Sequence, residues 1–130
     1  MKQVYISKVA CLTALGFGPD TLWQGLLDGQ SGIAELQRFS CENYVSSMAA
    51  LIDDLQAPAG DSRLDPLLER LADQLGGVPQ DTRLLVASTK GEIDKLEGAC
   101  RAGEQLPEAI LFEPLLQKIS QRFGLFDSGM

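Results

Sequence analysis

The spacing of apolar residues near the amino terminus predicts a strand followed by a helix. Residues 3–16 (QVYISKVACLTALG) are rich in Val, Ile, Tyr and Thr and end at a glycine, which is typical of a strand and its turn. In the next stretch, residues 16–32, Pro19 suits the first helical position, Asp20 favours the helix dipole, and Gly29 suits a left-handed helix end. We expect this helix to bury Leu22, Leu26 and also Trp23 and Leu27.

Further along, leucines at helical spacing predict a second helix that ends at Gly76–Gly77, with Asp65–Pro66 at its cap and first position. Residues 82–88 (TRLLVAS) then read as a short apolar strand, residues 92–103 as a helix, residues 104–109 as a loop and residues 113–124 as a last helix. The inward positions are predicted to be Leu64, Leu67, Leu68, Leu71 and Leu75 in the second helix, and Leu115, Leu116, Ile119 and Phe123 in the last.

One stretch, residues 39–61, is ambiguous. Met48, Leu51, Ile52 and Leu55 have helical spacing, yet so short a run could equally be a strand. The order of strands and helices nevertheless indicates the α/β class, with a small, mainly parallel sheet in one domain that spans residues 1–130. Two or three strands make a thin sheet, so most of the apolar strand surface would need neighbours beyond those this pattern supplies.

Composition restricts the functions that this chain could have. A 130-residue chain with 45% hydrophobic residues is expected to bury a core, and it has neither a long apolar run nor a signal peptide, so we expect a soluble, cytoplasmic protein without a membrane partner. Its net charge of −7 disfavours nucleic acid. Because the chain has no histidine, its commonest general base and nitrogen ligand for metals are missing. We therefore predict no catalytic residues, no metal site and no cofactor within it.

The sequence Ser88-Thr89-Lys90-Gly91 follows the second predicted strand, where a phosphate-binding loop could lie. Such a loop needs glycines before a Gly-Lys-Ser/Thr sequence, and here the order is reversed. A capping box explains the residues better, with Thr89 as the cap and Glu92 reaching back to the amide of Thr89.

Other short patterns also have ordinary structural explanations. GFGPD at residues 16–20 is an incomplete dinucleotide fingerprint that fits a strand-to-helix turn. Asp53–Asp54 lacks further convergent ligands and is expected in a solvated loop. Three widely spaced cysteines suggest neither disulfides nor a metal site, and we expect packing roles for Cys11, Cys41 and Cys100.

Taken together, the segments resemble the amino-terminal part of the β-ketoacyl-acyl carrier protein synthases, condensing enzymes of the thiolase fold. Residues 4–33 are similar to that family's opening strand, turn and following helix, and residues 44–55, 62–75 and 82–97 resemble its next strand, helix and strand-helix pair. The matching residues in the first segment are Thr13, Leu15, Gly16, Trp23, Leu26, Leu27, Gly29, Ser31, Gly32 and Ile33.

The resemblance implies an α/β fold, namely the amino-terminal part of a thiolase-like, αβαβα layered domain with helices flanking its sheet. It implies a strand within residues 44–55. It also implies an acyltransferase of fatty acid or polyketide biosynthesis that forms a dimer and takes its substrates from acyl carrier protein. In such a domain, Ser88, Thr89 and Lys90 would lie beside the acyl-chain pocket or the dimer interface.

The sequence departs from the family's pattern at several positions. Lys8 and Ala10 stand where glycines are usual, Ala14 replaces a proline, and Thr89-Lys90 replaces a glycine and an apolar residue. A lysine beside an acyl pocket puts normal acyl-chain binding in doubt. Residues 121–130 resemble the segment that leads to the nucleophilic cysteine, so that cysteine and two later histidines are expected beyond Met130.

Three hypotheses follow from this pattern. The chain is a segment of a β-ketoacyl synthase, inactive alone and partnered by the remainder of the enzyme. Alternatively, it is a non-catalytic partner or interaction domain of a ketosynthase, akin to chain-length factors. The third hypothesis is an independent small α/β domain whose similarity is accidental.

Overall fold

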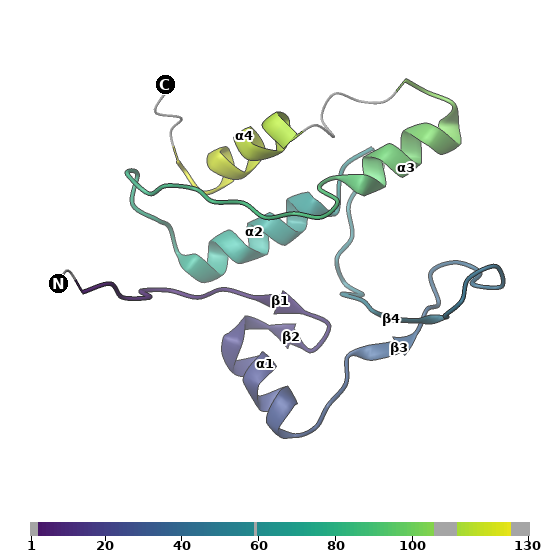
Figure 1. The fold of residues 1–130 in the computed structure, drawn as a ribbon, viewed down its shortest axis with the longest axis horizontal. Helices are drawn as coiled ribbons and strands as arrows, with labels where there is room; N and C mark the ends of the chain where they lie inside the picture. Colours follow the sequence, from purple (N-terminus) through teal and green to yellow (C-terminus); the bar gives the residue numbers. More distant parts are fainter. Residues whose placement is uncertain (1–2, 59, 106–111, 126–130) are drawn as a thin grey trace. The chain divides into compact units, whose positions relative to one another are not determined.

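A computed structural model describes residues 3–58, 60–105 and 112–125 (Figure 1). The chain divides into two compact units, Met1–Asp54 and Leu55–Met130. Each unit has its own internal packing and is described by itself. The assignment of residues 1–130 to one domain stays a prediction.

From residue 3 onward, the first unit contains four short strands and one helix. The strands pair as two hairpin-like ladders, and both ladders are antiparallel. The elements are β1 (Leu12–Thr13), β2 (Gly16–Phe17), α1 (Gly18–Leu27), β3 (Ile33–Glu35) and β4 (Met48–Ala50).

The helix α1 begins and ends as its sequence predicts, but its apolar face is not buried. Pro19 lies in its first turn, and Gly29 just beyond it has a φ of 67°. However, Trp23, Leu26 and Leu27 are 64%, 56% and 62% exposed, and Gly25 is the buried residue of the helix. The prediction of a buried face was therefore wrong for these three side chains: helical spacing identifies an apolar face, but the described residues do not cover it.

Two close contacts explain the glycines at residues 16 and 32, one before α1 and one after it. A Cβ atom added to Gly32 would lie 2.6 Å from Ala14 Cβ, and one added to Gly16 would lie 2.9 Å from Thr21 Cγ2. Gly16 also has a φ of 127°, which side chains rarely tolerate. The GFGPD sequence is thus used as a turn into a helix, as predicted.

The ambiguous middle stretch contains a strand. Met48–Ala50 pairs with Ile33–Glu35, so that Ala49 lies opposite Ala34. The sequence indicated no strand at Ile33–Glu35, because three residues are too few to show an alternating pattern.

The predicted mainly parallel sheet is not what the described residues form. Both observed pairs are antiparallel, and β1 is only two residues long within the predicted strand at residues 3–16. Residues 82–88 form no strand either. Strand pairing needs a neighbour at the right distance, and sequence periodicity reports a strand's faces but not its neighbours. The coarser prediction of a mixed α/β chain is correct.

The described part of the second unit contains three helices, α2 (Leu64–Leu75), α3 (Ile93–Ala102) and α4 (Phe112–Arg122). They match the predicted helices at residues 66–75, 92–103 and 113–124 to within two residues. Helix α2 ends at Gly76 in the left-handed conformation, as predicted, but its cap residue is Arg63 and not Asp65. The loop predicted at residues 104–109 lies largely outside the described residues.

The core of this unit lies between α2 and α4. Leu68, Leu115 and Ile119 are buried in one cluster, against which further apolar side chains pack. Leu84 and Val86 belong to that second group, although their segment is not in a sheet. The packed residues are Leu64, Leu67, Leu84, Val86 and Phe123.

Two glycines near the end of α3 give a matched test of the helix geometry. Gly103 has a φ of 69°, whereas Gly98 lies inside the helix, and a Cβ at either position would meet nothing within 4 Å. We expect Gly103→Ala to lower the free energy of unfolding by about 1 kcal/mol and Gly98→Ala to raise it by about 0.5–1 kcal/mol. Urea unfolding followed by circular dichroism measures both, and equal effects of the two changes would contradict the observed helix end.

Candidate functional site

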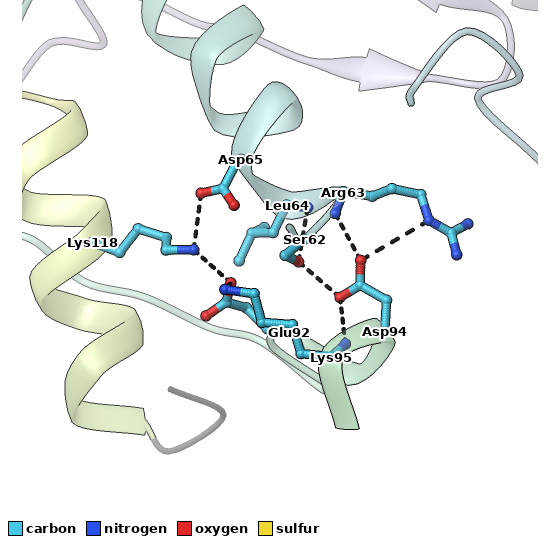
Figure 2. Close-up of polar contacts among 8 residues, drawn as sticks. All are labelled: Ser62, Arg63, Leu64, Asp65, Glu92, Asp94, Lys95 and Lys118. Carbon is cyan, nitrogen blue, oxygen red and sulfur yellow. Dashed lines mark hydrogen bonds and ion pairs between the residues drawn. The ribbon is translucent and has the colours of Figure 1, made fainter. Parts of the chain in front are cut away.

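The most densely bonded group of polar side chains joins the three helices of the second unit. Figure 2 shows that these side chains converge from the starts of α2 and α3 and from α4. We call this group the polar cluster; it consists of Ser62, Arg63, Asp65, Glu92, Asp94, Lys95 and Lys118.

One half of the polar cluster is centred on Glu92. This residue is only 2% exposed, and its Oε1 lies 2.5 Å from Lys118 Nζ and 3.0 Å from Lys95 Nζ. Lys118 Nζ also lies 2.9 Å from Asp65 Oδ1. A buried carboxylate needs charged partners, and the two lysines supply them. Through its ion pairs with Asp65 and Glu92, Lys118 also connects α4 both to α2 and to the residue that precedes α3.

The other half is centred on Asp94, in the first turn of α3. Its carboxylate accepts hydrogen bonds from Ser62 Oγ at 2.7 Å, from the amide of Arg63 at 2.7 Å and from the amide of Lys95 at 3.1 Å. Ser62 Oγ in turn accepts from the amide of Leu64 at 3.2 Å. The starts of α2 and α3 are therefore held together by shared hydrogen bonds.

The charges in the polar cluster shift two pKa values. Burial raises the pKa of Asp94, but the hydrogen bonds from the Arg63 amide, Ser62 and the Lys95 amide outweigh burial and hold it below 3.8. Burial lowers the pKa of Lys118, but its hydrogen bonds to Glu92 and Asp65 outweigh burial and raise it above 10.5. Both residues are thus held in their charged forms at neutral pH.

The geometry suits a structural role better than a catalytic one. Ser62 is fully buried, and its hydroxyl is already engaged as a donor to Asp94 and an acceptor from Leu64. A nucleophile needs access to its substrate, and this fully buried hydroxyl has none. Among the described residues, no group of three or more His, Cys, Asp or Glu residues could hold a metal ion.

The hydrogen bonds to Asp94 predict an acid-sensitive contribution to stability. Because its pKa is lower in the folded chain, the contribution is fully present above pH 3.8 and is lost as the pH falls through the lowered value. We expect Asp94→Asn to flatten the loss of stability on the acid side, as measured by urea unfolding at a series of pH values. Asp73→Asn, at an exposed position of α2, is the control and should leave the wild-type slope.

The residues predicted beside an acyl pocket lie outside the polar cluster. Ser88, Thr89 and Lys90 are all exposed, and Ser88 Oγ accepts a hydrogen bond from the amide of Gly91 at 2.9 Å. The predicted capping box is wrong, because α3 begins at Ile93 and its cap has no side-chain hydrogen bond. Glu92 is used instead as the buried partner of two lysines, which the local motif could not reveal.

Sequence reasoning missed the central members of the polar cluster. Ser62 lies just before the second predicted helix, and Lys118 lies beside inward leucine and isoleucine positions of the last predicted helix. Asp94 had one available signal, since an acidic residue in the first turn favours a helix start. Its partners Ser62 and Arg63 are more than 30 positions away along the chain, and no local pattern connects them to Asp94.

The remaining predicted features have mixed outcomes. Cys11 and Cys41 are partly buried, but Cys100 is exposed, so its predicted packing role is wrong. Asp53 and Asp54 are exposed, in a turn. Within the described segments, no helix is both long and apolar enough to cross a bilayer.

Comparison with known proteins places part of the sequence near the β-ketoacyl synthases, which confirms the resemblance. The chain is 48% identical over 42 residues to the granaticin polyketide putative β-ketoacyl synthase 2 of Streptomyces violaceoruber, covering 32% of this chain and 10% of that protein. It is 34% identical over 56 residues to the actinorhodin polyketide putative β-ketoacyl synthase 2 of Streptomyces coelicolor, covering 43% and 14%.

A third relative has a different description. The 3-oxoacyl-[acyl-carrier-protein] synthase 2 of Vibrio harveyi is 28% identical over 64 residues, covering 49% of this chain and 15% of that protein. The aligned region thus spans only 10–15% of the length of these relatives. No family model matches the chain, and no solved structure matches it significantly.

Proposed function

We propose that this chain supplies the amino-terminal framework of a β-ketoacyl-acyl carrier protein synthase-like acyltransferase of fatty acid or polyketide biosynthesis. The observation that carries the proposal is the sequence similarity to synthases of both kinds. In the complete assembly, the framework would become part of a thiolase-like, αβαβα layered domain.

Exposed apolar side chains on α1 support a framework role. Trp23, Leu26 and Leu27 stand at positions of the family's first helix motif, and all three are more than half exposed. Exposed apolar side chains that adjoin one another on a helix mark a surface that another polypeptide covers. Further polypeptide of a synthase would cover this face of α1.

The chemistry is assigned to residues beyond this chain. Condensation needs a thiolate to accept the acyl group and groups that stabilise the carbanion formed on loss of carbon dioxide. The chain has no histidine, and its three cysteines stand at none of the family's nucleophile positions. We therefore propose that the isolated chain is inactive, and that acyl carrier protein binds only to the complete, dimeric enzyme.

The segment Ser88–Lys90 is proposed to border the acyl-chain pocket or the dimer interface in that assembly. All three side chains are exposed in the described structure, so a second polypeptide can reach them. The ammonium group of Lys90 would be costly beside an acyl chain, because burying an unpaired charge in apolar surroundings is unfavourable. Lys90 would therefore shorten the acceptable acyl chain or pair with a carboxylate across the interface.

The test combines an activity assay with an association assay. The purified 130-residue chain, given malonyl- and acyl-loaded carrier protein, should release no carbon dioxide above the rate without protein. The remainder of a β-ketoacyl synthase, expressed as a separate polypeptide, should co-purify with the chain, and Trp23→Ser should weaken this association. Condensation by the chain alone would overturn the proposal, as would the absence of any complex.

A second candidate is a non-catalytic partner of a ketosynthase, akin to a chain-length factor. The charged Lys90 near the proposed pocket favours it, because such a residue can limit product length without taking part in the chemistry. In this case, adding the chain to an active ketosynthase should change the length of its products, and Lys90→Leu should lengthen them. Unchanged product lengths with both the wild-type chain and Lys90→Leu would contradict this second candidate and favour the first proposal.

A further inference from the structure

Helix α3 is attached to the rest of the second unit by polar contacts at its start. Figure 2 shows that Glu92 meets Lys118 of α4, and that Asp94 meets Ser62 just before α2. Among the described residues, no hydrogen bond or ion pair joins residues 96–102 to α2 or α4. The polar attachment of α3 to the other two helices is therefore confined to one end.

The apolar attachment of α3 is small. The buried cluster of the unit is formed by α2 and α4, and within the described residues no apolar side chain of α3 belongs to it or packs against it. The buried residue of α3 is Ala99, whose side chain is a single methyl group, and Ile93 and Leu96 are only partly buried. Because apolar stabilisation grows with buried area, α3 gains less from burial than α2 and α4 do.

A glycine in the left-handed backbone conformation lies beyond each end of α3. Gly91 has a φ of 53° and precedes the cap residue Glu92, and Gly103 has a φ of 69° and follows the last turn. Glycine changes its backbone torsion angles at low steric cost, and hinges are commonly a few residues at the ends of elements. The helix can therefore turn as one body between these two positions.

We propose that α3 is a hinged helix, which opens from the α2–α4 pair as one unit at Gly91 and Gly103 while α2 and α4 stay packed. The contacts of Glu92 and Asp94 with the other two helices are its latch. Proteins open locally in cooperative units, and elements with few buried apolar contacts open most readily. Opening gives solvent access to Ser62 and Glu92, which are 0% and 2% exposed in the closed form. The inference does not depend on a ketosynthase function.

The test is hydrogen exchange of assigned amides in the full chain at pH 7. In the wild type, the amides of residues 97–102 should exchange faster than the most protected amides of α2 and α4. Their exchange should also depend less on low concentrations of urea, because opening one helix exposes less surface than unfolding the unit. The same urea dependence for amides of all three helices would overturn the proposal.

A variant in the latch and a matched control test what holds α3 closed. Asp94→Asn removes the charge from the latch, so the α3 amides should exchange about tenfold faster, as expected for weakened hydrogen bonds to a charged group. Glu97→Gln makes the same carboxylate-to-amide change at an exposed position of α3 outside the latch, and it should leave the exchange unchanged. Equal exchange in the wild type and Asp94→Asn would contradict the latch.

A variant in the apolar cluster separates opening of α3 from unfolding of the whole unit. Ile119 stays packed while α3 is open, so Ile119→Val should accelerate exchange of the most protected α2 and α4 amides about two- to tenfold and leave the α3 amides unchanged. In a single cooperative unit, this variant would accelerate the amides of all three helices equally. That result would overturn the hinged helix.

Discussion

Leu115→Ala is expected to lower the free energy of unfolding of the second unit by about 2–5 kcal/mol. Leu115 is 4% exposed and lies with Leu68 and Ile119 in the buried cluster. Truncation to alanine removes apolar contacts from both helices and leaves a cavity that neighbouring side chains fill only in part. Because small domains have only about 5–15 kcal/mol of stability, this change should shift the unfolding midpoint strongly or abolish folding of the unit.

The measurement is urea unfolding followed by ellipticity at the helical band, to which α2, α3 and α4 contribute most of the described helical residues. Leu85→Ala is the matched control, because it makes the same chemical change at a side chain that is 97% exposed. We expect that control to stay within about 0.5 kcal/mol of the wild type. Similar losses for both variants would show that α2 and α4 do not enclose Leu115.

The second large effect is expected for Lys118→Met, which removes the cation shared by Glu92 and Asp65. Glu92 would keep Lys95 as its partner, but Asp65 would lose its only ion pair among those described in the polar cluster. Removing one partner of a buried ion pair leaves a charge without compensation. Since Lys95 compensates in part, we expect a loss of about 1–3 kcal/mol in urea unfolding at pH 7.

The pH dependence of this variant has a definite sign. The pKa of Lys118 is raised in the folded chain, so its contribution to stability is complete below its ordinary pKa of 10.5 and is lost as the pH rises through the raised value. The wild type should therefore lose more stability than Lys118→Met in this alkaline range. An equal loss in the two proteins would contradict the ion pairs assigned to Lys118.

Arg122→Met on the same helix serves as the control for charge removal. Arg122 Nη1 lies 3.9 Å from Glu69 Oε1, and both side chains are more than a third exposed. Exposed ion pairs contribute about 0–1 kcal/mol, so this variant should have close to wild-type stability. A loss of stability as large as that of Lys118→Met would show that the effect arises from removing a positive charge from the helix rather than from breaking a buried ion pair.

The helices of this chain could be predicted because their information is local. The spacing of leucines identified α2, and a glycine after the last turn fixed its end at Gly76. The ends of α3 and α4 are likewise followed by glycines with positive φ, Gly103 and Gly124. Helix formation depends on neighbours three and four positions away, which any single sequence displays.

The strands and the polar cluster could not be predicted in the same way. The apolar run at residues 82–88 was predicted to be a strand. Leu84 and Val86 of this run pack against the core, but the run itself could not supply a pairing partner. Glu92 matched a capping motif locally, and its burial against Lys118 depends on a residue 26 positions later. Contacts between residues so far apart in the sequence are decided by packing, and a short local motif does not predict them.

The exposed indole on α1 gives this chain an optical reporter of its own. Trp23 is the single tryptophan of the sequence and is 64% exposed, so its emission should lie close to that of indole in water and be readily quenched by iodide. Any polypeptide that covers α1 would move this emission to shorter wavelengths and protect it from the quencher. The kinetics of assembly can thus be followed without a label, at the helix where the first unit leaves its apolar face open.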